Sequence, residues 1–147
     1  MASKIYNEST LNLEEVEELL HNLVDFAKKR LGFSDYPAIR FLDDEENSRK
    51  VLGKTANYNP GNSVISIYTS GRHPKDMLRS VSHELVHHKQ NEDGRFSNAG
   101  FTGSGYAQKN SDLRELEREA YEKGNMCFRD WEDGIKQQNP TIYNEWR

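Results

Sequence analysis

The stretch His83-Glu84-Leu85-Val86-His87 decides how the rest of the chain is interpreted, because it combines two imidazoles with a carboxylate. Residues four apart lie on the same face of an α-helix, so His83 and His87 can direct ring nitrogens at one point. Zinc binds histidine nitrogens at about 2.0–2.1 Å, which this spacing permits. Glu84 lies beside that point and can accept a proton from a water that the metal activates. The stretch therefore predicts two metal ligands and a general base.

A solvated helix face that carries two histidines and a glutamate is the alternative interpretation of so short a pattern. Random order would produce the pattern in roughly 1% of chains of this composition. The flanking residues favour a helix, since Pro74 suits a first turn and apolar residues follow at helical spacing. These apolar residues are Met77, Leu78, Val81 and Leu85. We therefore prefer the metal site.

A catalytic zinc site needs a third protein ligand and leaves its fourth position to water. A later helix is predicted to carry an apolar stripe: Leu113, Leu116, Ala120 and Gly124. Glu117 lies beside this stripe, whereas Glu115 and Glu119 are expected on the opposite, solvent-facing side. A carboxylate at the edge of an apolar stripe is costly unless it is paired or bound to metal, so Glu117 is the predicted third ligand. Pairing of Glu117 with Arg114 or Arg118 is the alternative.

Asp93 is a second candidate for the third ligand. Residues 83–93 have the spacing H-E-x-x-H-x-x-Q-x-x-D, and metzincin-type proteases place His or Asp at the last of these positions. Those proteases need glycine for a sharp turn where this chain has Gln90, so the match is broken. His88 is not expected to be the third ligand, because it is rotated by about 100° from His87.

Length and composition predict one domain over residues 1–147, with a core of about 12–131 and a short C-terminal extension over 132–147. The formal net charge of −4 gives no support for nucleic-acid binding. A single cysteine, Cys127, excludes an intrachain disulfide framework and a cysteine-rich zinc site. No signal-like segment is present, and no apolar run approaches the ~18 residues that span a bilayer. We therefore expect no membrane association and a cytoplasmic localisation.

Hydrophobic periodicity and turn signals predict an α+β fold. The predicted elements are a helix over 12–32, a strand over 38–42, a hairpin of 55–58 with 64–68, the motif helix, a long loop over 91–110, and a helix from Ser111 or Asp112 to about Trp131. Asn59-Pro60-Gly61-Asn62 is the turn of the hairpin. The sheet is thus expected to be small, with about three mostly antiparallel strands.

The hairpin strand V-I-S-I-Y, the motif H-E-L-V-H and the later E-x-x-A resemble the small gluzincin peptidases over about residues 37–131. The resemblance is greatest to the minimal versions (minigluzincins) related to the ImmA/IrrE peptidases, and similar small zincins are carried by tailed phages. It implies a zincin-like fold and one zinc per chain, bound by His83, His87 and Glu117 with Glu84 as base. Many relatives have Asp or Asn where this chain has Tyr121.

The resemblance implies a zinc metallopeptidase, a hydrolase that cleaves a peptide or protein substrate, in a host cytoplasm or virion if the chain is phage-encoded. An extended peptide is expected to pair with Val64–Tyr68 as an edge strand. Tyr106, Tyr121 and His88 are candidates for stabilising the oxyanion or steadying a ligand. The alternative is a non-catalytic zinc-binding structural or regulatory protein with the same fold. The sequence leaves the substrate and the oligomeric state open.

Overall fold

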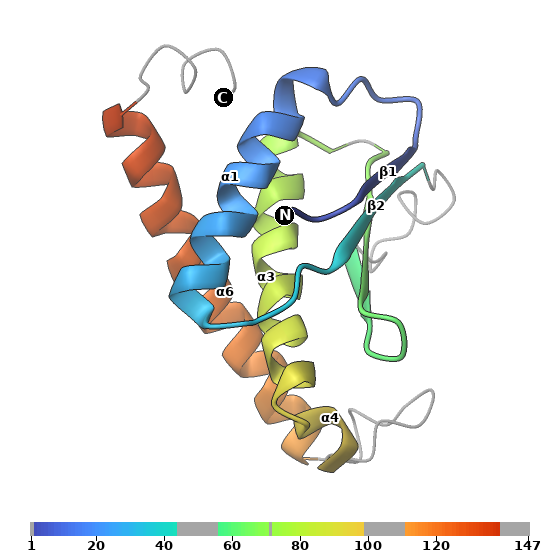
Figure 1. Cartoon of the computed structure of the whole chain (residues 1–147), viewed down its shortest axis with the longest axis vertical. Coiled ribbons are helices and arrows are strands. Elements are labelled where there is room, and N and C mark those ends of the chain that lie inside the picture. The colour runs from blue at the N-terminus through green and yellow to red at the C-terminus, as the bar shows by residue number, and fades with distance from the viewer. Residues whose placement is uncertain (1, 44–55, 71, 99–110, 139–147) are drawn as a thin grey trace.

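The computed structural model describes residues 2–43, 56–70, 72–98 and 111–138. The helices and strands are β1 (Ile5–Glu8), α1 (Glu14–Leu31), β2 (Ala38–Leu42), β3 (Ala56–Asn59), β4 (Val64–Tyr68), α3 (Pro74–Glu92), α4 (Arg95–Asn98) and α6 (Ser111–Gln138). Helix α3 is the centre of the arrangement, because it contacts β3 and β4 on one side and α6 on the other, with α1 beside it (Figure 1). The α+β class is therefore confirmed.

The sheet differs from the prediction of about three mostly antiparallel strands. It has four strands in the order β1-β2-β4-β3, of which β1–β2 and β2–β4 are parallel and only β3–β4 is antiparallel. Strand β1 precedes α1 and β2 follows it. A helix that connects two neighbouring strands lets the second strand run in the same direction as the first, so β1 and β2 are parallel. Only Ile5 of β1 is partly buried while its other residues are exposed, so β1 lacks the alternation that predicts a strand.

Strand β4 is internal, which corrects the prediction of a peptide-binding edge at Val64–Tyr68. It pairs with β2 on one side and β3 on the other, so its backbone groups are already used. Among the described strands the edges are β1 and β3.

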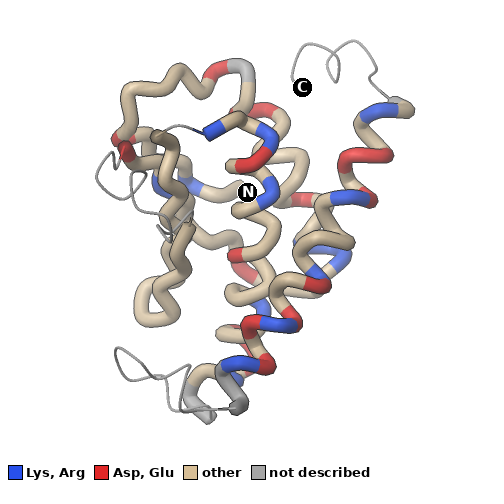
Figure 2. Tube along the Cα trace, turned by 180° about the vertical axis from the view of Figure 1, so that it is seen from behind, with Lys and Arg blue, Asp and Glu red and all other residues tan. Residues whose placement is uncertain are grey.

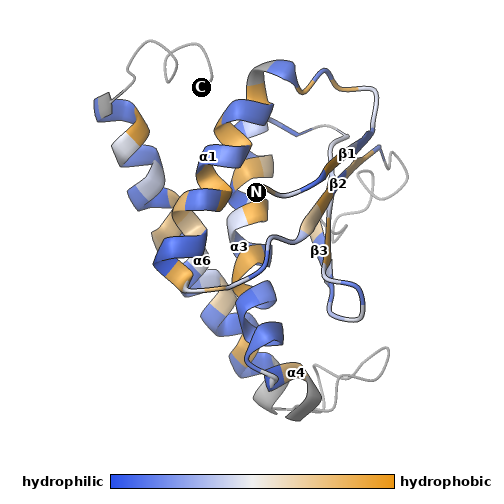
Figure 3. Cartoon of the chain, viewed as in Figure 1, coloured by the Kyte–Doolittle hydropathy of each residue, from blue (hydrophilic) through white to orange (hydrophobic). Residues whose placement is uncertain are grey.

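The helix predicted over residues 12–32 is confirmed as α1, and its apolar stripe faces the core (Figure 3). Its buried members are Val16, Leu19, Leu20, Leu23 and Ala27. Gly32 ends the helix in the left-handed conformation with φ 87°, and its N–H donates to the carbonyl of Lys28. Glycine adopts this conformation without the steric cost that a side chain brings.

Helix α6 continues beyond the predicted end near Trp131 to Gln138, and Ile135 joins the core. Charged residues of both signs follow one another along it (Figure 2). Helix α3 likewise runs to Glu92, and α4 follows it within the predicted loop over 91–110. Within the described part of the chain, no helix has the length and apolar content needed to cross a bilayer.

Candidate metal centre

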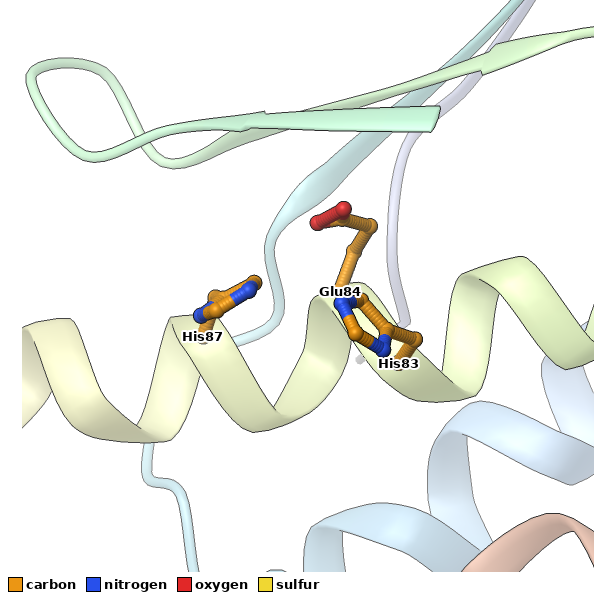
Figure 4. Close-up of side chains that lie close together, drawn as sticks. All are labelled: His83, Glu84 and His87. Atoms are coloured by element: carbon orange, nitrogen blue, oxygen red, sulfur yellow. The ribbon is translucent and has the colours of Figure 1, made fainter. Parts of the chain in front are cut away.

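Helix α3 presents His83 and His87 on one face, one turn apart (Figure 4). Pro74 occupies the first turn, and the His73 side chain caps the helix by accepting a hydrogen bond from the Lys75 N–H at 3.1 Å. The apolar residues predicted for α3 are all fully buried, which fixes the rotation of the helix. The two imidazole centroids lie 5.1 Å apart. Their side chains are 18% and 9% exposed, so both rings border solvent.

Glu117 reaches this pair from α6. Its Oε1 atom lies 2.7 Å from Nε2 of His83 and 3.4 Å from Nε2 of His87. One carboxylate oxygen therefore faces both histidines, although Glu117 is distant from them in the sequence. Its side chain remains 52% exposed, which leaves the centre open on this side.

The close approach of α6 to α3 at Gly124 makes this meeting possible. A Cβ atom at Gly124 would lie 2.9 Å from Cα of His83, a separation that real side chains do not reach. The Ser82 hydroxyl also donates to the carbonyl of Gly124 at 2.8 Å. A glycine therefore lets the helix that carries Glu117 lie directly against the helix that carries His83.

The charges of the centre are coupled. Hydrogen bonds from His83 and His87 hold the pKa of the Glu117 carboxyl well below its usual range, despite the opposing effect of burial. Burial lowers the pKa of His87, but the contact with Glu117 and the nearby Glu84 carboxylate outweigh it, so this pKa is raised. The centre therefore favours a positive charge on or near His87 and a negative charge on Glu117.

Glu84 extends from α3 toward the sheet, beside the two rings (Figure 4). It is buried, and one of its oxygens, one ring nitrogen of His83 and one ring nitrogen of His87 lie within 4.8 Å of one another. This cluster could hold a metal ion. Imidazole nitrogens and carboxylate oxygens, here with the Glu117 carboxylate beside them, are ligand types that bind divalent metal ions.

Gln90 is the residue of the centre that the sequence did not suggest, because it was considered only as a break in a metzincin pattern. It is buried, and its Oε1 lies 2.8 Å from Nδ1 of His87. Its amide nitrogen donates to the carbonyl of Leu116 at 2.9 Å and to Glu119 at 3.0 Å. The spacing of three residues along α3 was the only available signal, since such residues are neighbours on a helix.

Glu119 does not lie on the solvent face of α6, which corrects the prediction. Its side chain is 20% exposed, and it contacts Gln90 and Arg95. Burial raises the pKa of Glu119, but these two hydrogen bonds outweigh it and lower the pKa overall. Glu115, by contrast, is exposed and pairs with Arg118. Glu119 thus faces α3 because α6 crosses it closely.

Of the remaining candidates, Asp93 and His88 lie away from the ring nitrogens of His83 and His87, whereas Tyr121 lies beside the His83 ring. Asp93 follows α3 and pairs with Lys89 at 2.8 Å; the helix stays regular through Gln90, so Asp93 is about 9 Å further along the axis than His87. His88 is buried on another face. Tyr121 lies with its ring centroid 4.6 Å from that of His83. Tyr106 lies outside the described residues.

Comparison of the chain with protein-family models, with curated proteins and with solved structures gives no match.

Proposed function

We propose that this chain is a zinc-dependent metallopeptidase with a zincin-like fold of the small gluzincin type. His83, His87 and Glu117 would bind one zinc ion, and Glu84 would be the general base. The observation that carries the proposal is the position of Glu117 Oε1, which faces Nε2 of both histidines at 2.7 and 3.4 Å. Three donor atoms of the kinds that catalytic zinc uses thus meet from two helices.

The surroundings of His87 support a cation at this point. Nδ1 faces the side-chain amide oxygen of Gln90, and Nε2 faces the carboxylate of Glu117. A neutral imidazole has only one N–H and can donate to only one of these two acceptors, so the pair favours positive charge at His87. A metal ion held by Nε2 and Glu117 would supply this charge in place of a second ring proton.

The separations of the donor atoms also suit zinc. Ligand atoms of a tetrahedral zinc site lie about 3.3–3.4 Å apart, given bonds of about 2.0–2.1 Å. The 3.4 Å between His87 and Glu117 matches this value, and the 2.7 Å between His83 and Glu117 is a hydrogen bond that a metal would replace.

Different residues of the chain would carry out the separate tasks of peptide hydrolysis. The ion, when bound, supplies electrostatic activation of a water and of the scissile carbonyl. Glu84 would accept the proton of the attacking water and pass it to the leaving amine. Because β4 is internal, an extended peptide would pair instead with β3, the edge strand that contacts α3. Tyr121, 60% exposed beside His83, would contact the substrate or the oxyanion.

Metal content tests the proposal. Mass spectrometry would be run on the wild type, Glu117→Ala and Asp93→Ala, purified without chelators. Glu115→Ala is the matched control, because Glu115 lies on the same helix and is, like Glu117, 52% exposed. We expect one zinc per chain in all except Glu117→Ala. A wild type without metal would overturn the proposal, and loss in Asp93→Ala would assign the third ligand to Asp93.

Cleavage of a mixed peptide library by the zinc-loaded chain then tests catalysis. Cleavage that stops on chelation and returns with zinc would support the peptidase. A chain that holds zinc but cleaves neither library peptides nor casein would favour the non-catalytic alternative, a zinc-binding structural or regulatory protein.

A further inference from the structure

Gln90 has no part in the proposed chemistry, yet its side chain is fully buried beside the proposed metal centre. All three of its polar contacts are hydrogen bonds of 2.8 to 3.0 Å. They join His87 on α3 to Leu116 and Glu119 on α6. A buried amide is costly without hydrogen-bond partners, and both polar atoms of the Gln90 amide have partners on the two helices that meet at the centre.

The partners of Gln90 determine which way its amide points. The Leu116 carbonyl and the Glu119 carboxylate can only accept hydrogen bonds, so the amide nitrogen must face them. The amide oxygen therefore faces His87, and this oxygen can also only accept. Nδ1 of His87 must then carry a proton and donate it across the 2.8 Å contact.

Glu119 is itself held in place from the opposite side. The Arg95 guanidinium of α4 donates to its Oε1 at 2.6 Å, and the same oxygen accepts from Gln90. A polar chain Arg95–Glu119–Gln90–His87 therefore connects α4, α6 and α3. Rotation of the Gln90 amide would break both of its contacts to α6 at once, so the orientation is strongly determined.

We infer that Gln90 is a positioning residue that keeps the proton of the His87 ring on Nδ1 and directs the Nε2 lone pair at the metal position. The consequence for zinc affinity rests on the proposed function, whereas the position of the proton is a property of the metal-free chain. Partners of this kind fix the tautomer and ring orientation of histidine ligands, and their loss costs about 10- to 100-fold in metal affinity.

The test is ¹⁵N NMR of the histidine rings in the metal-free wild type at pH 8, with the His87 signals assigned by their loss in His87→Ala. We expect a proton on Nδ1 of His87. Gln90→Met, similar in size but without the amide, should lose this preference and raise the zinc Kd by about 10- to 100-fold. Asn91→Leu is the matched control: it removes the neighbouring amide, which contacts Tyr58 and Pro60, and should change neither value.

A proton on Nε2 rather than Nδ1 in the wild type would overturn the inference, as would Gln90→Met with an unchanged tautomer and zinc Kd. Should Gln90→Met not fold, Glu119→Ala takes its place, because Glu119 holds Gln90 within the same polar chain and is partly exposed; the expected changes have the same direction. A wild type that carries the Nδ1 proton but binds no zinc would support the positioning of the ring while removing the proposed function.

Discussion

His87 and His88 are consecutive and both buried, yet their rings have opposite kinds of surroundings. Nε2 of His88 donates to the carbonyl of Asp35 at 2.7 Å, with a carboxylate oxygen of Glu92 3.3 Å from the same nitrogen, and Nδ1 accepts from the hydroxyl of Tyr58 at 2.9 Å. Acceptors at one nitrogen and a donor at the other match the one N–H and the one lone pair of a neutral imidazole. The His88 ring is therefore satisfied by the protein alone.

Both nitrogens of His87 face acceptors instead, Gln90 on one side and Glu117 on the other. Burial alone therefore does not separate a structural histidine from a candidate metal ligand, whereas the donors and acceptors around the ring distinguish the two. The His88 region (His88, Tyr58, Asp35, Asn91 and Glu92) connects the loop that carries Asp35 and the hairpin that carries Tyr58 to α3. The His87 region (His83, Glu84, His87, Gln90 and Glu117) contains the cluster that could hold a metal ion.

Glu84→Gln is the change with the largest expected effect. It keeps the shape of the side chain but removes the base, so the rate of peptide cleavage should fall by about 10²- to 10⁴-fold while zinc content stays at the wild-type value. Cleavage rate and zinc content would be measured on the same preparation. Glu92→Gln is the control from the His88 region, because Glu92 accepts hydrogen bonds from the backbone N–H groups of Ser34 and Asp35. This substitution should lower the stability of the chain and leave the cleavage rate unchanged. Equal rates in Glu84→Gln and wild type would remove Glu84 from the mechanism.

Alanine substitution should remove zinc binding at His87 but lower the stability of the metal-free chain at His88. His87→Ala should abolish zinc binding and with it the rise in unfolding free energy that saturating zinc gives, about 2.7 kcal/mol at 100 times the Kd. His88→Ala should lower the stability of the metal-free chain by about 2–4 kcal/mol, because it leaves Tyr58 and Asp35 without their buried partner. Chemical denaturation with chelator and with zinc measures both.

Loss of zinc binding in a folded His88→Ala would contradict the distinction between the two histidines, because the partners of the His88 ring would then not describe its role. Stabilisation of His87→Ala by saturating zinc to the same extent as the wild type would contradict it as well.

Gly124→Ala should weaken zinc binding in the His87 region because it displaces the backbone of α6, without replacing any proposed ligand. A Cβ there would lie 2.9 Å from Cα of His83, so α6 must move and carry Glu117 with it. We expect a loss of about 1–3 kcal/mol in unfolding free energy and weaker zinc binding. Gly134→Ala on the same helix is the control, because a Cβ at that position meets nothing within 4 Å; it should stabilise the chain by about 0.4–1 kcal/mol. Equal effects of the two changes would contradict the close-approach argument.

The parts of this molecule that follow from a single helix were predictable from the sequence. The spacing of His83 and His87, the buried stripe of α1 and the position of Glu117 on the side of α6 that meets His83 all depend on the 3.6-residue period. Each needs only local geometry, so no knowledge of the neighbouring elements was required. The hairpin was equally local, because its Pro-Gly turn joins the two strands directly.

The parts that depend on how elements meet were not predictable in this way. The direction of β1 depends on α1 crossing back over the sheet, and the side chains of β1 carry almost no burial signal. Glu119 and Gln90 belong to the centre only because α6 lies close to α3 at Gly124. Periodicity assigns a face of a helix, but the neighbour that covers this face is fixed by tertiary packing.

Tyr58→Phe has the smallest expected effect and tests whether the His88 and His87 regions are independent. The change removes only the hydroxyl that donates to Nδ1 of His88 and accepts from Asn91 at 3.0 Å, while the ring still packs on Phe96. We expect a loss of about 1 kcal/mol in unfolding free energy, since a buried hydrogen bond is lost, and an unchanged zinc Kd. Denaturation and zinc titration of the same sample measure both quantities. Tyr6→Phe is the control, because Tyr6 is 48% exposed, and it should change neither the unfolding free energy nor the zinc Kd. A weakened zinc affinity in Tyr58→Phe would mean that the two regions are coupled through α3 and that the His88 ring also supports the metal centre.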